Sequence, residues 1–275
     1  MVRPIQHLGW CALVLVLALP LGARAHAPAT VFLEELTWTE VRDAIAAGQT
    51  TAIVPIGGTE QSGPAIVLGK HNQRVKFLSG KIAQALGNAI VAPVIAYVPE
   101  GRIDPPSSHM RFAGTLSIPD ELFERTLEYA ARSLRAHGFR DIVLLGDHGG
   151  YQRDLKRVAE RLNREWAASA VRVHAMDEYY RASDEGFARL LRERGYGDNE
   201  IGTHAALADT SLMLAVDPGA VRTDVLKAGK PLGAAEGVYG GDPRRASAQL
   251  GQLGVDQIVS KTVAAIRDRV VHRSP

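Results

Sequence analysis

The sequence contains a single cysteine, Cys11, which lies inside an apolar run near the N-terminus. Removal of that run would leave a chain without cysteine, which excludes both disulfide bonds and thiol chemistry. The sequence also lacks an excess of either charge, because 32 basic side chains stand against 30 acidic ones. The basic residues are not grouped with aromatic residues, so nothing in the composition requires nucleic acid or an anionic membrane surface as a partner.

The N-terminal segment has the composition of a secretory signal peptide. Basic residues precede an apolar run over residues 10–21, which ends at the small-residue triplet Ala23-Arg24-Ala25. The run has about a dozen residues, whereas a helix that spans a membrane needs roughly 20. We therefore expect a cleaved signal peptide over residues 1–25 and a mature domain over residues 26–275. The expected product is periplasmic or secreted and has no stable membrane association.

Apolar runs of strand length alternate with segments of helical periodicity. The expected strands are 51–56, 89–98, 141–145 and 170–175, and the expected helices are 74–86, 119–137, 152–166 and 255–270. Uninterrupted apolar strands separated by amphipathic helices indicate a parallel sheet with both faces covered. Since no internal repeat or domain linker is apparent, the sequence predicts one α/β domain, an α/β/α sandwich with a mostly parallel sheet.

Two long stretches do not fit this alternation. Residues 57–72 and 100–115 are rich in glycine, proline and polar residues, and each follows the C-terminal end of an expected strand. Open parallel sheets bind ligands at that edge, and long irregular loops inside a compact domain are usually functional. The sequence therefore predicts a site at the carboxyl edge of the sheet.

Residues able to bind a metal or move protons gather in short segments at strand ends or in loops. Taken singly, each has an ordinary explanation: Glu60 as a turn cap, His71 as a solvated loop residue, His148 as part of a strand-to-helix turn. Together, one Glu and two His at one edge of a sheet form a ligand set for zinc or a similar divalent ion.

In this order, these segments resemble the motifs of the creatininase family. Residues 55–64, Pro-Ile-Gly-Gly-Thr-Glu-Gln-Ser-Gly-Pro, are similar to a motif that continues as Glu-Gln-His-Gly-Pro-His. Residues 109–117 are similar to the family motif His-x-x-Phe-Pro-Gly-Thr-Ile-Ser, and residues 146–150 to Gly-His-Gly-Gly. Residues 204–211 are similar to His-Ala-Gly followed by Glu-Thr-Ser, and residues 237–244 to Gly-x-x-Gly-Asp-Pro. The resemblance runs from about Leu33 to the last helix and implies the fold of that family.

The resemblance also implies a metal site, because the family binds two divalent ions. Glu60 and His148 match ligands of the family, whereas His71 stands at the position of the aspartate that bridges the two ions. Ser62 stands at the position of a ligand histidine, and Ala65 replaces another histidine nearby. A neutral imidazole cannot bridge two ions as a carboxylate does.

We therefore expect one divalent ion, zinc with manganese or iron as alternatives, held by Glu60, His71 and His148. A fourth position would be left to water, with Asp209 close by as a candidate fourth ligand. A site with three protein ligands and one open position is the arrangement of catalytic zinc.

The resemblance implies roles for the remaining polar residues. His204 matches a histidine that transfers a proton and is the candidate general acid, while Asp209 is the candidate base or water-orienting group. His109 and Arg111 are expected to hold the substrate. Asp147 either orients a ligand imidazole or caps the following helix.

The expected function is hydrolysis of a C–N bond in a small cyclic or linear amide by a metal-activated water. Hydrolysis of a lactone or ester, and an exported binding protein with a decayed site, are the alternatives. Creatinine is not supported as the substrate, because Gly149 and Gly150 follow His148 where members that hydrolyse creatinine carry a further acidic ligand. Since family members commonly form hexamers, the resemblance also implies a homo-oligomer.

Overall fold

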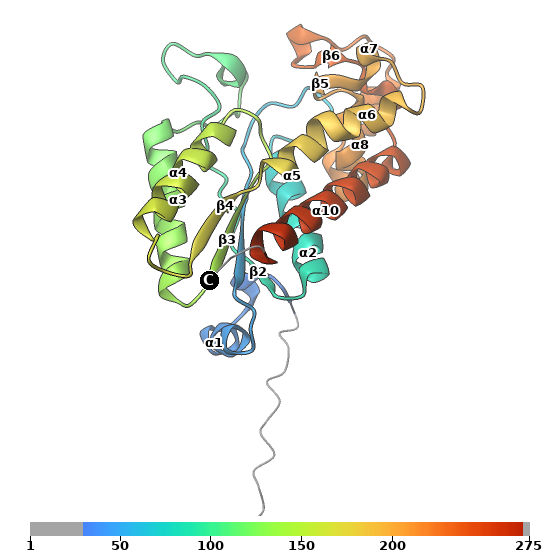
Figure 1. Ribbon diagram of the computed structural model, residues 1–275. Coiled ribbons are helices and arrows are strands. Elements are labelled where there is room, and N and C mark those ends of the chain that lie inside the picture. Colours follow the sequence, from blue (N-terminus) through green and yellow to red (C-terminus); the bar gives the residue numbers. More distant parts are fainter. Residues whose placement is uncertain (1–29, 272–275) are drawn as a thin grey trace, which may run out of the picture.

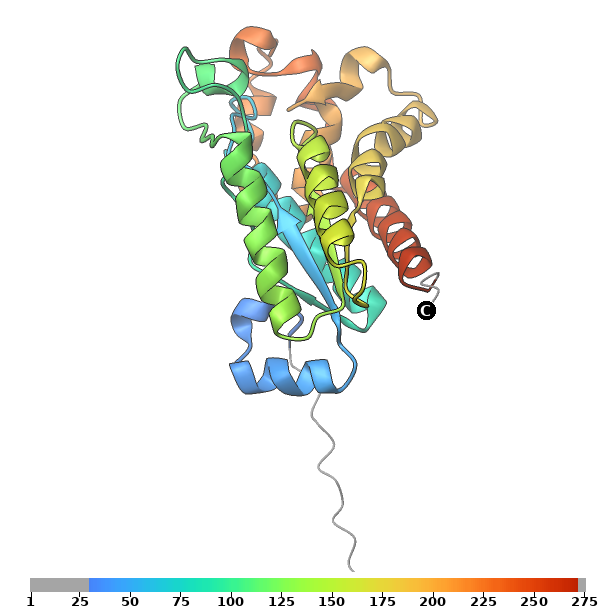
Figure 2. The ribbon, with the colours of Figure 1, turned by 60° about the vertical axis from the view of Figure 1, so that its left-hand side comes forward.

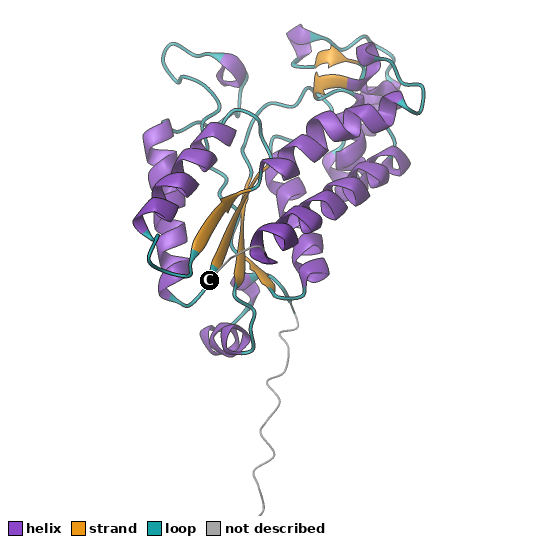
Figure 3. Ribbon diagram, in the orientation of Figure 1, coloured by secondary structure: helices purple, strands orange, loops and turns teal. Residues whose placement is uncertain are grey.

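The computed structural model describes residues 30–271, which fold around a four-stranded sheet (Figure 1, Figure 3). The strands are β1 Thr51–Ile56, β2 Ala89–Val91, β3 Asp141–Gly146 and β4 Arg172–Ala175, and they are parallel in the order β2-β1-β3-β4. β1 pairs along its whole length with β3, from Thr51 opposite Asp141 to Ile56 opposite Gly146. The carboxyl ends of these two central strands therefore lie side by side.

Both faces of the sheet are apolar, and helices cover each of them. Ile53 and Val143 face α2 Lys70–Leu86 and α10 Ala248–Val271, whereas Val54 and Leu144 face α3 Asp120–Ala136 and α4 Gln152–Glu165. This division follows the period of two along a strand, which sends successive side chains to opposite faces. Figure 1 shows the two helical layers on either side of the strands, and the predicted α/β/α sandwich is confirmed.

A smaller part of the chain lies beyond the carboxyl edge of the sheet. There, β5 Gly202–His204 pairs antiparallel with β6 Tyr239–Gly241, and α8 Leu207–Val216 follows β5. Helix α1 Trp38–Ala46 lies at the opposite end of the strands (Figure 2). The other short helices are η1 Leu33–Glu35, η2 Ser108–Arg111, α5 Asp177–Arg181, η3 Ala182–Gly186, α6 Phe187–Arg192, α7 Asp198–Ile201, η4 Pro218–Ala220, α9 Thr223–Lys227, η5 Ala234–Glu236 and η6 Pro243–Arg245.

The second strand is shorter than the expected 89–98. It ends at Val91, and Pro93 follows shortly after it. Proline has no N–H to donate to a neighbouring strand. The chain nevertheless continues beside β1, because Ile95 N donates to Pro55 O (3.0 Å) and Gly57 N donates to Ile95 O (3.0 Å). The backbone of residues 95–98 therefore still leads to the carboxyl edge of the sheet.

Two helices begin earlier than the sequence predicts. Helix α2 starts at Lys70 instead of residue 74, and its N-cap, Gly69, supplies no side-chain hydrogen bond that would mark the start. Helix α10 starts at Ala248 instead of residue 255 and contains Gly251. Glycine weakens a helix, but a Cβ atom on Gly251 would lie 1.8 Å from Ser211 O of α8. This glycine therefore allows the two helices to pack closely.

The predicted signal peptide, residues 1–25, lies outside the described residues. Within residues 30–271, none of the helices is both long and apolar enough to cross a membrane.

Candidate metal site

The candidate site lies at the carboxyl edge of the sheet, where several elements meet. Glu60 follows β1, His71 is in the first turn of α2, His148 follows β3, and His204 ends β5. A cavity of about 330 Å³ opens at this edge. Its walls include Lys70, His71, Arg74, His109, His148, His204 and Asp209.

Glu60 is the centre of this site, and its side chain is 0% exposed. Its backbone N–H donates to Leu68 O (3.1 Å), which holds the loop between β1 and α2. The glycines that precede Glu60 make room for side chains from other segments. A Cβ atom on Gly57 would lie 2.1 Å from Asn72 Oδ1, and one on Gly58 would lie 2.4 Å from Glu100 Oε1. The Gly-Gly sequence before Glu60 therefore serves close packing around its carboxylate.

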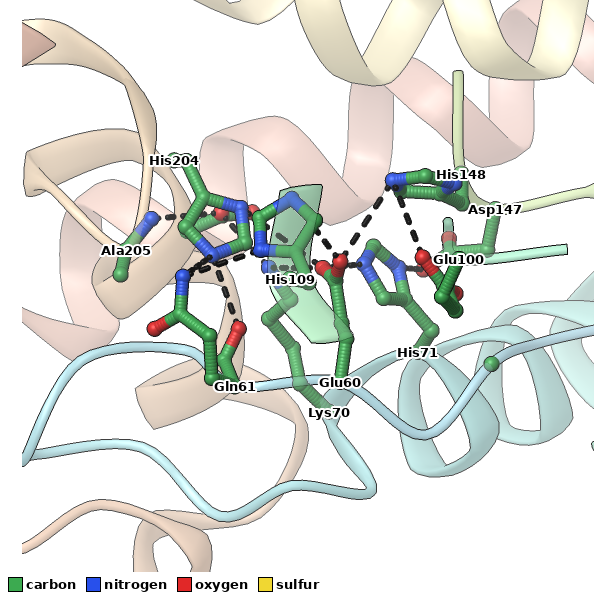
Figure 4. Close-up of polar contacts among 12 residues, drawn as sticks. Glu60, Gln61, Lys70, His71, Glu100, His109, Asp147, His148, His204 and Ala205 are labelled. Atoms are coloured by element: carbon green, nitrogen blue, oxygen red, sulfur yellow. Dashed lines mark hydrogen bonds and ion pairs between the residues drawn. The ribbon is translucent and has the colours of Figure 1, made fainter. Parts of the chain in front are cut away.

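The structure brings Glu60, His71 and His148 together, as the sequence predicts. One ligand atom from each lies within 4.8 Å of the others. His71 Nε2 is 2.7 Å from Glu60 Oε1, and His148 Nε2 is 3.5 Å from Glu60 Oε2. Figure 4 shows both rings beside the Glu60 carboxylate.

Asp147 orients His71. His71 Nδ1 donates to Asp147 Oδ2 (2.7 Å), and the same carboxylate accepts from Arg74 Nε (2.8 Å) and from the Tyr179 hydroxyl (2.6 Å). Helix α4 has no side-chain hydrogen bond at its N-cap. These contacts therefore favour a role for Asp147 in orienting a ligand imidazole over a role as helix cap. A carboxylate that accepts from Nδ1 directs Nε2 of the ring toward Glu60 and toward an ion bound there.

A second group shares Glu60 and contains His109 and His204, again with ligand atoms within 4.8 Å of one another. His204 Nε2 donates to Gln61 O (2.9 Å), and its Nδ1 lies 3.6 Å from Glu60 Oε1. The Gln61 side-chain amide lies 3.0 Å from His109 Nδ1, while His109 Nε2 lies 3.3 Å from Glu60 Oε2. Gln61 therefore fixes both rings with respect to Glu60.

Asp209 lies in neither group. Its carboxylate accepts from Lys70 Nζ (2.9 Å), Arg74 Nη1 (2.7 Å) and the Ala205 N–H (2.9 Å). Lys70 is 1% exposed, and its ammonium group is also 3.5 Å from Glu60 Oε1. The sequence analysis missed Lys70 and Arg74. The available signal was their spacing with His71, since residues 70, 71 and 74 fall in one helical turn.

Glu100 is another residue that the sequence analysis missed. It is 3% exposed, and neither of its carboxylate oxygens has a hydrogen-bond partner among the described residues. Its Oε2 lies 3.6 Å from His148 Nε2. Burial and the adjacent negative charge of Glu60 raise the pKa of Glu100 to about 9.

Burial and charge also set the protonation of the other groups. Burial acts to raise the pKa of Glu60, but Lys70 and His71 outweigh it and hold that pKa well below its usual value. Burial lowers the pKa of His148 to about 4, and burial with the charge of Lys70 lowers the pKa of His204 to about 3. Both rings are therefore neutral near pH 7, and a neutral ring is the form that binds a metal.

The remaining predicted residues lie apart from these groups. Arg111 is exposed on η2 and is not part of the cavity wall, whereas His109 is. Ser62 is 1% exposed, and its hydroxyl oxygen has no hydrogen-bond partner among residues 30–271.

The donor set fits a divalent ion. Glu60 Oε2 and both oxygens of Glu100 are buried without a donor among the described residues. An unpaired buried carboxylate is costly unless a cation compensates it. Imidazole and carboxylate together suit zinc, manganese and iron.

Comparisons with known proteins agree with this chemistry. The creatininase family model, described as creatinine amidohydrolase, matches residues 34–266. The creatinine amidohydrolase of Pseudomonas putida is 26% identical over 198 residues, which cover 71% of this chain and 75% of that protein. The mycofactocin precursor peptide peptidase of Mycolicibacterium smegmatis is 28% identical over 243 residues, which cover 81% of this chain and 85% of that protein.

Solved structures are similar over most of the chain. A structure described as "Creatininase Mn" is 26% identical and superposes with a TM-score of 0.70, covering 88% of this chain and 99% of that one. A creatininase variant described as "Zn-Zn type" is 25% identical, with a TM-score of 0.70 and the same coverage of 88% and 99%. The motifs, the fold and the matched residues agree, and the chain belongs to the creatininase family.

Proposed function

We propose that this protein is a metal-dependent hydrolase that cleaves a C–N bond in a small cyclic or linear amide. One observation carries the proposal: Glu60 is fully buried at the carboxyl edge of the sheet, and one of its oxygens lies beside the imidazoles of His109 and His148 without a hydrogen-bond donor among the described residues. Relatives named creatinine amidohydrolase and peptide peptidase both act on C–N bonds, which supports this class of reaction.

Glu60, His71 and His148 would hold one divalent ion. When bound at such a site, zinc or a similar ion polarises a carbonyl group and lowers the pKa of a water molecule to about 7. A single ion is supported by Lys70, whose ammonium group lies 3.5 Å from Glu60 Oε1. Its positive charge disfavours a second cation in the group of Glu60, His109 and His204.

His204 is positioned to transfer a proton. Because its Nε2–H donates to Gln61 O, the neutral ring carries its lone pair on Nδ1, which faces Glu60. Nδ1 can accept a proton as water attacks the substrate carbonyl and then deliver it to the leaving nitrogen. His204 would thus act first as a base and then as the acid that the resemblance implies.

Asp209 would act as a positioning residue. Its carboxylate accepts from Lys70, Arg74 and the Ala205 N–H, and these contacts occupy it as an acceptor. This arrangement supports neither the role of base nor that of fourth ligand. Instead, it keeps the Lys70 ammonium beside Glu60.

The test combines metal analysis with a substrate screen. Purified protein is loaded with zinc, manganese or iron(II), dialysed, and assayed for bound metal and for turnover of cyclic amides, N-formyl and N-carbamoyl compounds. About one tightly bound equivalent and turnover that ceases after chelation are expected. Tightly bound metal without turnover of any amide, but with binding of one of these compounds, would favour a binding protein instead.

We also propose that the protein is exported and oligomeric. Residues 1–25 have the composition of a signal peptide, and family resemblance is the basis for an oligomer. N-terminal sequencing of protein from the extracytoplasmic fraction should begin at or near His26, and light scattering should give a mass several times that of one chain. A retained Met1 in that fraction would contradict export, and a monomeric mass would contradict assembly.

A further inference from the structure

Glu100 is held at the candidate site by a fixed backbone. Its N–H donates to Ser117 Oγ (3.0 Å), and the Ser117 hydroxyl donates in turn to Gly101 O (2.7 Å). Ile118 N donates to Val98 O (3.2 Å). These hydrogen bonds join the start and the end of the long loop after β2 just beside Glu100. They therefore fix the backbone position from which the Glu100 carboxylate extends.

The surroundings of this carboxylate are a second acid, Glu60, and the imidazole of His148. Both oxygens of Glu100 and Oε2 of Glu60 are buried without a hydrogen-bond partner among residues 30–271. His148 lies between the two carboxylates, and Figure 4 shows its ring above them. Folding brings two acids together here, and the cationic groups of the described chain lie on the other side of Glu60, where Lys70 Nζ is 3.5 Å from Oε1. A bound cation would offset the cost of burying two acids together.

The spacing of the ligand atoms suits a single ion. His148 Nε2 lies 3.5 Å from Glu60 Oε2 and 3.6 Å from Glu100 Oε2. A tetrahedral ion with bonds of about 2.1 Å holds its ligand atoms about 3.4 Å apart. Small side-chain movements would therefore allow all three atoms to bind the same ion.

Gly58 supplies independent support for this assignment. A Cβ atom there would lie 2.4 Å from Glu100 Oε1, and the backbone φ of +152° is one that other residues rarely adopt. Glycine at this position therefore admits the Glu100 carboxylate to the space beside Glu60.

We propose that Glu100 is a further metal ligand, a carboxylate that the loop after β2 adds to Glu60 and His148. This inference deepens the proposed function and rests on it. It also accounts for His71: the family bridges its ions with an aspartate at that position, and Glu100 supplies a carboxylate from a different loop. A ligand set with two carboxylates is harder than a set with one carboxylate. The second carboxylate therefore shifts the metal preference from zinc toward manganese or iron(II).

The test is a titration of metal-free protein with Mn²⁺ and with Zn²⁺, compared between the unmodified chain and Glu100→Gln. Glutamine keeps the shape of the side chain but cannot form the anion that binds a metal ion. The matched control is Asp184→Asn, which removes an exposed acid from the wall of the same cavity. Circular dichroism checks the fold of each variant, and if Glu100→Gln does not fold, Glu100→Asp replaces it, with a smaller loss expected.

Glu100→Gln should weaken Mn²⁺ binding by more than about tenfold and weaken Zn²⁺ binding less, while Asp184→Asn changes either by less than about twofold. In metal-free protein, Glu100→Gln should not lower the melting temperature, because glutamine keeps the shape of a side chain that has no hydrogen-bond partner among residues 30–271. Unchanged affinity for both metals would overturn the assignment of Glu100 and leave the proposed function standing. If the unmodified protein binds neither metal, both proposals fail.

Discussion

The two oxygens of the Glu60 carboxylate have different surroundings. Oε1 lies 2.7 Å from His71 Nε2 and 3.5 Å from Lys70 Nζ, and the charges beside it are paired in turn with Asp147 and Asp209. Within residues 30–271, Oε2 has no hydrogen-bond donor, and its buried neighbour Glu100 has none either. The first side is saturated by the protein's own groups. The second leaves acceptors that a bound cation would satisfy, which is how a metal site differs from a structural ion-pair network.

The strongest test of this contrast removes the shared carboxylate. Glu60→Gln should lose most of the bound metal and about 10⁴-fold in turnover, since a metal ion contributes several kcal/mol to such reactions. Metal content after dialysis and turnover of a responsive amide are measured, with the exposed Glu160→Gln as the control. Full metal content in Glu60→Gln would show that the ion is held elsewhere.

His204→Ala separates proton transfer from metal binding. Turnover should fall by about 10²- to 10⁴-fold, the usual contribution of a general acid or base, while metal content stays unchanged. His137→Ala, at the C-terminal end of α3, is the control. Equal turnover in His204→Ala and the unmodified protein would remove this ring from the mechanism, and the proton would have to come from another group.

Asp147→Asn tests whether the saturated side supports the metal. The substitution keeps the shape but weakens the acceptor for His71 Nδ1. Loss of such a partner typically lowers metal affinity by about 10- to 100-fold. Zinc affinity measured by competition with a chelator gives the answer. An affinity within about twofold of the unmodified value would mean that Asp147 serves folding alone, through Arg74 and Tyr179.

Tyr179→Phe should have the smallest effect. It removes the hydroxyl that donates to Asp147 Oδ1 (2.6 Å), and Arg74 continues to hold that carboxylate. We expect the free energy of unfolding to fall by about 1–2 kcal/mol, with little change in metal affinity. Urea denaturation of metal-free protein measures the first and chelator competition the second. A loss of metal affinity as large as that of Asp147→Asn would show that the hydrogen bonds on the Oε1 side of Glu60 cannot be changed without weakening metal binding.

The central sheet could be predicted because its strands are uninterrupted apolar runs. Residues 51–56 are recovered in full as β1, since β1 is covered on both faces and shows no polar alternation. The end of β2 could not be predicted, because the chain beyond Pro93 is held by bonds from Ile95 to β1 that depend on tertiary position. The early start of α10 was missed because Gly251 reads as a break until its contact with α8 is known.

The site could be predicted only in part. Glu60 and His148 lie in recognisable motifs that follow strands, His71 lies eleven residues after Glu60, and the structure brings the three together. Glu100 carries no such signal, because its position depends on the bond of its N–H to Ser117, 17 residues later in the chain. Lys70 belongs to the irregular stretch 57–72 of the sequence, and its burial follows from the start of α2 at this position.

That first turn of α2 has a mechanical consequence. Lys70 and His71 are neighbours in the chain and Arg74 follows one turn later, yet their side chains reach three different carboxylates, those of Asp209, Glu60 and Asp147. A helix moves as a stiff rod, so a shift of α2 by one residue would displace the metal-facing imidazole and the ammonium group at once. Arg74 would carry the displacement on to Asp209 and the start of α8. An engineer who wished to alter the number of ions would therefore have to redesign this turn as a unit, because its positions cannot be adjusted one by one.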